Sequence, residues 1–207
     1  IEKAHPTILD KFLQILEDGR MTDGQGQTVY FSECIIIFTS NLGIYTRDAR
    51  GERHLNVTMD MTYEDVAKRV RRAIEDYFKL ELGRPEILNR IGENIVVFDF
   101  IRPDVAERIL AAQVKKIVRF LREDKEIALT LSDKAQAKLR EAALCNLANG
   151  GRGIGNIVES HLINPLSRFL FDHDLYERTC VEVQDIDAFT TPVSLIAEAR
   201  PMDEQAA

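Results

Sequence analysis

Ile35-Ile36-Ile37-Phe38-Thr39-Ser40-Asn41 is the stretch of sequence that decides the fold. Four large apolar residues run without a break and end at three small polar ones. Such a run is typical of a strand buried on both faces, as in a parallel sheet with helices on either side. Because open α/β sheets bind ligands beyond the carboxyl ends of their strands, Asn41 is a candidate to reach a ligand. The alternative is that the polar residues only end the strand and cap the next segment.

The composition excludes several broad classes of protein. The 207 residues are enough for one large domain or two small ones, and 45% hydrophobic with 29% charged residues is ordinary for a globular chain. A net charge of -7 gives no support to a general nucleic-acid or membrane-surface role. The three cysteines and four histidines show no metal-ligand spacing, and no apolar run is long enough to span a membrane. We expect a cytoplasmic protein without a bound metal, specific nucleic acid or membrane partner.

Helical and strand periodicities divide the chain into three parts. Residues 1–101 contain an amphipathic helix, a glycine-rich loop or hairpin at residues 19–33, the strand quoted above and a second apolar run at residues 95–98. Residues 102–186 alternate helices with short strands, which predicts a small α+β domain. Residues 187–207 lose periodicity and end in polar residues, so we expect a disordered tail.

Five motifs, in this order and spacing, resemble the Clp family of AAA+ ATPases, in particular the C-terminal ATPase module of ClpA- and ClpB-like unfoldases. The resemblance covers roughly residues 1–186. The motifs are Ile1-Glu2-Lys3-Ala4-His5-Pro6, the stretch from Asp18 to Val29, Asn41-Leu42-Gly43, Arg84-Pro85-Glu86-Ile87-Leu88-Asn89-Arg90-Ile91 and Gly150-Gly151-Arg152.

The resemblance implies an α/β fold: a partial AAA+ large domain with a parallel sheet, followed by a small α+β domain. The family's sheet has the strand order 5-1-4-3-2. Residues 34–38 resemble its fourth strand and residues 95–98 its fifth, so the first strand, which would lie between them, belongs upstream. We therefore expect open strand edges in the first part of this chain and independent folding of the second.

The resemblance also implies roles for individual residues. Asn41 matches sensor 1, where an amide helps to hold the attacking water or the γ-phosphate. Arg90 matches the arginine finger, which acts in the site of the neighbouring subunit, and Arg152 matches sensor 2. The loop with Gly24, Gln25 and Gly26 would lean toward the central pore of a ring. Without the resemblance, both arginines are ordinary surface residues and the glycines are ordinary turn residues.

Two parts of an ATPase site are missing from the sequence, and some motifs depart from the family. No GxxxxGK[ST] phosphate loop occurs, and the acidic pair of Walker B would fall immediately before Ile1, so Glu2 is not the catalytic glutamate. We expect the parent protein to use ATP and Mg²⁺, and this chain alone to bind no nucleotide and to be inactive. Gly83, Gly92 and Gly153 replace residues that the family usually has, which indicates a divergent branch.

The sequence alone is consistent with two functions. The first is a part of a Clp-type ATPase that assembles into a ring, usually of six subunits, and couples ATP hydrolysis to the unfolding, disaggregation or remodelling of protein substrates. The second is a nucleotide-free oligomerisation or binding module derived from the same fold. The missing phosphate loop favours the second, and the abrupt first residue favours the first.

Overall fold

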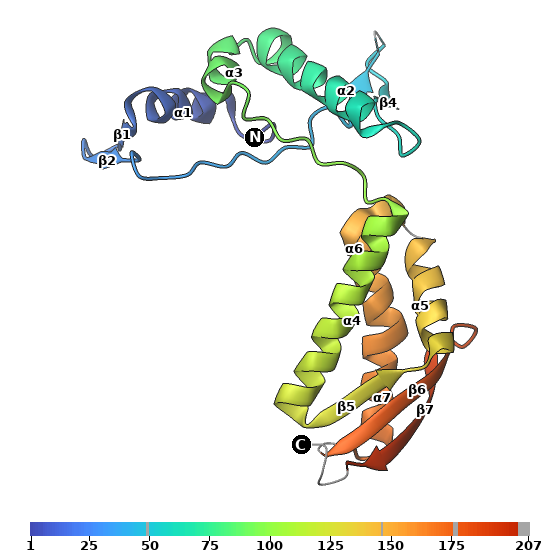
Figure 1. The fold of residues 1–207 in the computed structure, drawn as a ribbon. Helices are drawn as coiled ribbons and strands as arrows, with labels where there is room; N and C mark the ends of the chain where they lie inside the picture. The colour runs from blue at the N-terminus through green and yellow to red at the C-terminus, as the bar shows by residue number, and fades with distance from the viewer. Residues whose placement is uncertain (49, 146, 176–177, 203–207) are drawn as a thin grey trace. The chain divides into compact units, whose positions relative to one another are not determined.

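The computed structural model describes residues 1–48, 50–145, 147–175 and 178–202, which form two compact units with their boundary between Asp99 and Phe100. Figure 1 shows the elements of each unit. Among the described residues, no helix is both long enough and apolar enough to cross a membrane.

The first unit consists of short helices and two small hairpins. The first helix, α1 (Pro6–Asp18), ends at Gly19, which has a left-handed φ of 64°. The chain turns there directly into the first hairpin. At the other end of α1, Pro6 occupies the first turn and the side chain of His5 accepts a hydrogen bond from the backbone N–H of Thr7. The elements are α1 (Pro6–Asp18), β1 (Arg20–Thr22), β2 (Thr28–Tyr30), β3 (Tyr45–Arg47), β4 (Arg53–Leu55), α2 (Tyr63–Asp76), the π-helical η1 (Tyr77–Glu81) and α3 (Pro85–Ile91).

The core of the first unit lies where α1, η1 and α3 meet. Leu9, Phe78 and Ile87 are almost completely buried there, and Leu13 and Leu88 pack around them. α1 is far along the sequence from η1 and α3, which follow one another, so the burial of these side chains fixes α3 against α1.

The two apolar runs expected to be buried strands are extended but do not belong to a sheet among the described residues. Ile35 and Ile37 are 91% and 79% exposed, and Val96 and Phe98 are 76% and 87% exposed, whereas Val97 is only 7% exposed. In each run, therefore, the side chains on one face are at least partly buried, and the alternate side chains on the other face are exposed. Burial on both faces requires neighbouring strands and a second helical layer, and the described part of the chain supplies neither.

Side chains of α2 hold the second apolar run in place. The guanidinium of Arg71 donates a hydrogen bond of 2.7 Å to the carbonyl of Ile95, and the hydroxyl of Tyr63 donates one of 3.2 Å to the carbonyl of Val97. Both carbonyls lie on the same edge of the extended segment, because backbone groups two residues apart point the same way.

The second unit is a three-stranded sheet with helices. Its order is β5-β6-β7, with β5 parallel and β7 antiparallel to β6. The helices meet the sheet through buried aliphatic side chains such as Leu129, Leu139, Ile154, Leu162 and Val183. The elements are α4 (Pro103–Lys125), β5 (Ile127–Leu131), α5 (Asp133–Leu144), η2 (Leu147–Asn149), α6 (Gly150–Val158), the π-helical η3 (Glu159–Ile163), α7 (Asn164–Asp172), β6 (Thr179–Asp187) and β7 (Ser194–Pro201).

Pro165 divides the last helical stretch, as its position within an otherwise helical pattern predicts. It lies in the first turn of α7, directly after the π-helical turn η3. Proline lacks a backbone N–H and its ring clashes with the carbonyl four residues earlier in a regular helix. The wider π turn relieves this clash, because it displaces the carbonyls that the ring would otherwise meet.

The expectation of a disordered tail at residues 187–207 is wrong where the structure describes it. Residues Ser194–Pro201 form β7, which pairs with β6 over eight residue positions from Asp187–Ser194 to Thr179–Pro201. Only Leu195 and Ala197 of this strand pack on the core. The strand is thus held by backbone pairing rather than by an apolar face, which is why its side-chain pattern did not reveal it. Residues 203–207 of the expected tail lie outside the described residues.

Asp185 is the charged residue that ties β6 to α5. It lies at the irregularity of the β6–β7 pairing, and it accepts contacts of 2.7 Å from both Lys134 and Lys138. The hydrogen bonds from Lys134 and Lys138 hold the pKa of Asp185 at about 2, below its ordinary value of 3.8. The carboxylate therefore stabilises the folded state only while it is ionised.

We expect Asp185 to make the second unit sensitive to acid. Because its pKa is lower in the folded state, the folded protein loses this stabilisation as the pH falls from about 5 toward 2. Asp185→Asn should flatten the decline of unfolding free energy over that range and lower stability at neutral pH. Urea unfolding at a series of pH values measures both. Glu182→Gln, at an exposed position of the same strand, serves as the control and should keep the wild-type slope.

Candidate functional site

Asn41 lies at the polar end of the first apolar run, where Glu2 holds the backbone. The hydroxyl of Ser40 donates a hydrogen bond of 2.8 Å to Glu2, and the backbone N–H of Asn41 donates one of 3.3 Å to the same carboxylate. The side chain of Asn41 is exposed and its amide makes no hydrogen bond to another described residue. The backbone is thus positioned while the amide remains available to a ligand.

The carboxylate of Glu2 is charged throughout the ordinary pH range. Burial works to raise the pKa of Glu2, but hydrogen bonds from the Ser40 hydroxyl and from backbone N–H groups, including that of Asn41, outweigh it and hold the pKa at about 2. Glu2 uses both carboxylate oxygens on this strand end. Glu2 therefore fixes the position of the Asn41 backbone by hydrogen bonds. This structural role is consistent with its exclusion as the catalytic glutamate.

Gly43 fixes the turn that comes after Asn41. Its φ is +84°, and a Cβ at this position would lie 2.8 Å from the Cα of Val70 in α2. The carbonyl of Gly43 also accepts a hydrogen bond of 2.8 Å from the side chain of Asn56. Glycine is needed here both for the backbone conformation and for the close approach, so Gly43 sets how Asn41 sits relative to α2.

We expect Gly43→Ala to destabilise the protein by about 2–4 kcal/mol, because it combines a strained φ with a steric clash against backbone. Equilibrium urea unfolding measures the loss. Gly26→Ala is the matched control: its φ is +82°, but no atom lies within 4 Å of an added Cβ. That substitution should cost only about 1 kcal/mol, the backbone part of the effect. Equal losses for the two variants would contradict the close approach at Val70.

Arg90 lies in the last turn of α3 and contacts α1. Its Nη2 is 2.9 Å from Oε1 of Glu17, and its side chain is 49% exposed. A guanidinium has five N–H donors in a rigid plane, and this contact occupies one of its two terminal nitrogens. The other donors of this half-exposed side chain have no partner among the described residues and suit a phosphate group.

Asn41 and Arg90 are held at opposite ends of the same helix. Glu2, four residues before α1, contacts the Asn41 backbone, whereas Glu17, in the last turn of α1, contacts Arg90. A helix of 13 residues is roughly 20 Å long, which is further than the two side chains can bridge. The two groups therefore do not meet on one phosphate within a single copy of this chain.

Arg152 belongs to the second unit and lies in the first turns of α6, where it lines a cleft of about 670 Å³. Gln113 and Lys116 of α4 line the same cleft, as does Asn156. The side chain of Arg152 is exposed and forms no ion pair with another described residue. Lys116 is a second cation of this cleft that the sequence did not reveal, because α4 and α6 are remote along the chain.

Gly24, Gln25 and Gly26 form the tip of the β1–β2 hairpin. The side chain of Asp23 accepts hydrogen bonds of 2.8 Å from the N–H of Gln25 and 2.9 Å from the N–H of Gln27, which shapes the turn. All three tip residues are exposed. Asp23 explains the turn by itself, so the geometry is consistent with either alternative for the glycines.

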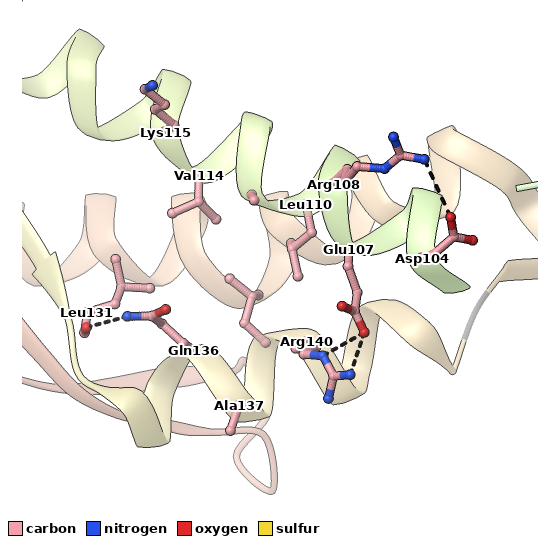
Figure 2. Close-up of a pocket in the computed structure, with 12 residues that line it drawn as sticks. Asp104, Glu107, Arg108, Leu110, Val114, Lys115, Leu131, Gln136, Ala137 and Arg140 are labelled. Atoms are coloured by element: carbon pink, nitrogen blue, oxygen red, sulfur yellow. Dashed lines mark hydrogen bonds and ion pairs between the residues drawn. The ribbon is translucent and has the colours of Figure 1, made fainter. Parts of the chain in front are cut away.

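Two other features could hold small ligands, and neither contains the residues above. Figure 2 shows a groove between α4 and α5, floored by Leu110, Val114 and Leu131, in which Glu107 pairs with Arg140 and Asp104 pairs with Arg108. The Glu107–Arg140 pair spans the groove from α4 to α5, and the Asp104–Arg108 pair lies within α4, so each of these charges has a partner.

On the β3–β4 hairpin, Asp48, Glu52 and His54 offer ligand atoms within 4.8 Å of one another. Asp48 already accepts hydrogen bonds from two backbone N–H groups and contacts the His54 ring at 3.1 Å. Backbone hydrogen bonds, foremost that of Glu52, and the contact with His54 lower the pKa of Asp48. The cluster could accept a cation, but its groups are also sufficient to close the turn of the hairpin.

Each of the two units matches a known protein family. Residues 1–94 match the family model of the AAA domain (Cdc48 subfamily), and residues 101–183 match that of the C-terminal, D2-small domain of ClpB protein. The chain is 36% identical over 178 residues to chaperone protein ClpB 1 of Thermosynechococcus vestitus, covering 86% of this chain and 19% of that protein. It is also 36% identical over 183 residues to chaperone protein ClpB of Agrobacterium fabrum, covering 88% of this chain and 19% of that protein.

A solved structure agrees in fold. The chain superposes on S. cerevisiae Hsp104, in its extended conformation with casein, with a TM-score of 0.67 and 26% identity over 96% of this chain and 31% of that one. An α/β AAA+ large-domain part followed by a small C-terminal domain is therefore the class of protein that the two units define. The chain belongs to the Clp family of AAA+ proteins, as a part of a ClpB-like module. It spans about a fifth of the length of the curated ClpB relatives it matches.

Proposed function

We propose that this chain is the part of a Clp-type AAA+ ATPase module that comes after Walker B, and that it supplies three phosphate-contacting groups to ATP hydrolysis. Asn41 acts as sensor 1, Arg152 as sensor 2, and Arg90 as an arginine finger in a neighbouring subunit. The substrate of the full-length protein is ATP, and its work is the unfolding, disaggregation or remodelling of proteins in a ring of six subunits. The hairpin tip at residues 24–26 faces the pore of that ring.

The separation of Asn41 and Arg90 along α1 is the observation that carries this proposal. Two groups held at opposite ends of a helix that is roughly 20 Å long are too far apart to serve the same γ-phosphate, but they can serve two phosphates on either side of one subunit. A ring meets this requirement, because each subunit then faces one site with Asn41 and the next site with Arg90. The half-exposed side chain of Arg90 is accessible to such a neighbour.

The residues present fit the phosphate end of ATP. An amide and two guanidiniums can donate hydrogen bonds to phosphate oxygens and stabilise the charge that develops on them. The phosphate loop and the Mg²⁺ ligands must come from residues outside this sequence, which has no GxxxxGK[ST]. The bare side chains of Ile35, Ile37, Val96 and Phe98 support this, because the missing part of the module would cover them.

A casein-bound Hsp104 structure and the ClpB chaperones among the relatives support a protein substrate. The match to the Hsp104 structure covers 96% of this chain. Both units of the chain would therefore take part in the proposed action on protein substrates. The missing phosphate loop is shared by both functions once the loop is supplied from outside this sequence, and the relatives found do not support the nucleotide-free module better than this function.

Substitution of Arg90 tests the proposal. In the full-length protein that contains this chain, Arg90→Ala should lower ATP turnover by roughly a thousandfold, because a finger stabilises charge only in the transition state. The mass of the assembly in nucleotide should stay unchanged. Arg119→Ala, an exposed arginine of α4 paired with Glu123, serves as the control and should keep full turnover.

Unchanged turnover in Arg90→Ala would remove Arg90 from the site and contradict the proposed mechanism. A loss of turnover together with a loss of the ring would instead assign Arg90 to assembly, and it would equally contradict the finger.

A further inference from the structure

The short helix α3 is held against α1 by an apolar contact that needs no charge. Ile87 of α3 is fully buried against Leu9 of α1 and Phe78 of η1. Leu88 and Ile91 add partly buried area to the same cluster. The position of the α3 backbone is therefore set by side-chain burial.

Two ion pairs lie along this contact. Arg84 Nε is 2.8 Å from Asp10 Oδ1, and Arg90 Nη2 is 2.9 Å from Glu17 Oε1. Asp10 and Glu17 are seven residues apart, which is two helical turns, so they share one face of α1. The two arginines are six residues apart, with Arg84 at the N-cap of α3 and Arg90 in its last turn. The helices thus run side by side in the same direction, with one ion pair at each end of the contact.

The two ion pairs are alike in exposure, but only one of them involves a proposed phosphate ligand. The side chains of all four residues are between 40% and 49% exposed, and such pairs contribute little to stability. Although these ion pairs contribute little to folding stability, each of them restricts the orientation of its arginine side chain. Arginine has a long, flexible side chain, and a carboxylate at one terminal nitrogen restricts where its guanidinium plane can lie.

We propose that Glu17 is a positioning residue for Arg90, which orients the guanidinium toward the nucleotide of the neighbouring subunit. This inference rests on the proposed role of Arg90. Glu17 binds Nη2 from the α1 side and leaves the other nitrogens to the phosphate. An oriented side chain loses less conformational freedom when the transition state forms, so the benefit appears in kcat. Asp10 performs the same structural task for Arg84 at the other end of the contact and provides an internal reference.

The test compares Glu17→Ala, Glu17→Gln and Asp10→Ala in the full-length protein that contains this chain. Glu17→Ala should lower kcat of ATP hydrolysis about threefold to fivefold with an unchanged KM, which is the range that a half-exposed ion pair allows. Glu17→Gln keeps an oxygen acceptor for Nη2 and should show a smaller loss. Asp10→Ala should leave kcat unchanged, although it removes an ion pair of the same kind. Thermal melting should give equal values for Glu17→Ala and Asp10→Ala.

A double substitution separates orientation from folding. If Glu17 acts through Arg90, then Glu17→Ala has no further effect on the low turnover of Arg90→Ala. An additional loss in the double variant would assign Glu17 a structural role and overturn the inference.

The single variants separate the inference from the function on which it rests. Lost turnover in Arg90→Ala with full turnover in Glu17→Ala would overturn only the role of Glu17. Full turnover in Arg90→Ala would overturn the proposed function and this inference together.

Discussion

The packing of α1 against α3 and η1 is the interaction on which the candidate site of the first unit depends. Leu9, Phe78 and Ile87 bring α1 together with η1 and α3, which are remote from it in the sequence, and this contact sets where Glu17 lies. Glu2, four residues before α1, contacts the backbone of Asn41, and Glu17, in the last turn of α1, contacts Arg90. A helix of fixed length between two groups that we propose to bind phosphate keeps them apart, regardless of how flexible the groups themselves are.

The sequence predicted most helices well because their determinants are local. Pro6 and Gly19 bound α1, Thr62 caps α2, and the division of the last helical stretch at Pro165 follows from the chemistry of proline. Family motifs located Asn41, Arg90 and Arg152, and their roles stay predictions. The two apolar runs were predicted to be buried strands, and among the described residues they join no sheet and leave alternate side chains exposed. A sequence pattern states which faces a strand can bury, whereas actual burial depends on neighbours that the described residues do not supply.

Contacts between distant residues were beyond the reach of the sequence. Glu17 and Lys116 gave no signal, because each is an ordinary charged residue on an amphipathic helix until a remote arginine lies beside it. The strand β7 was missed for a related reason. Edge strands can be stabilised mainly by backbone hydrogen bonds, and these depend on the register with β6 rather than on side-chain type.

The hydrogen bonds from α2 to the segment at residues 95–98 make the two margins of this segment different. Arg71 and Tyr63 occupy the carbonyls of Ile95 and Val97, so one margin of the segment already has its acceptors satisfied by side chains. The backbone groups of Val96 and Phe98 point to the other margin. A further strand can therefore add on that side alone, and any sheet completed here grows in one direction and stops at α2. The helix α2 therefore closes this margin of the segment without an extra strand.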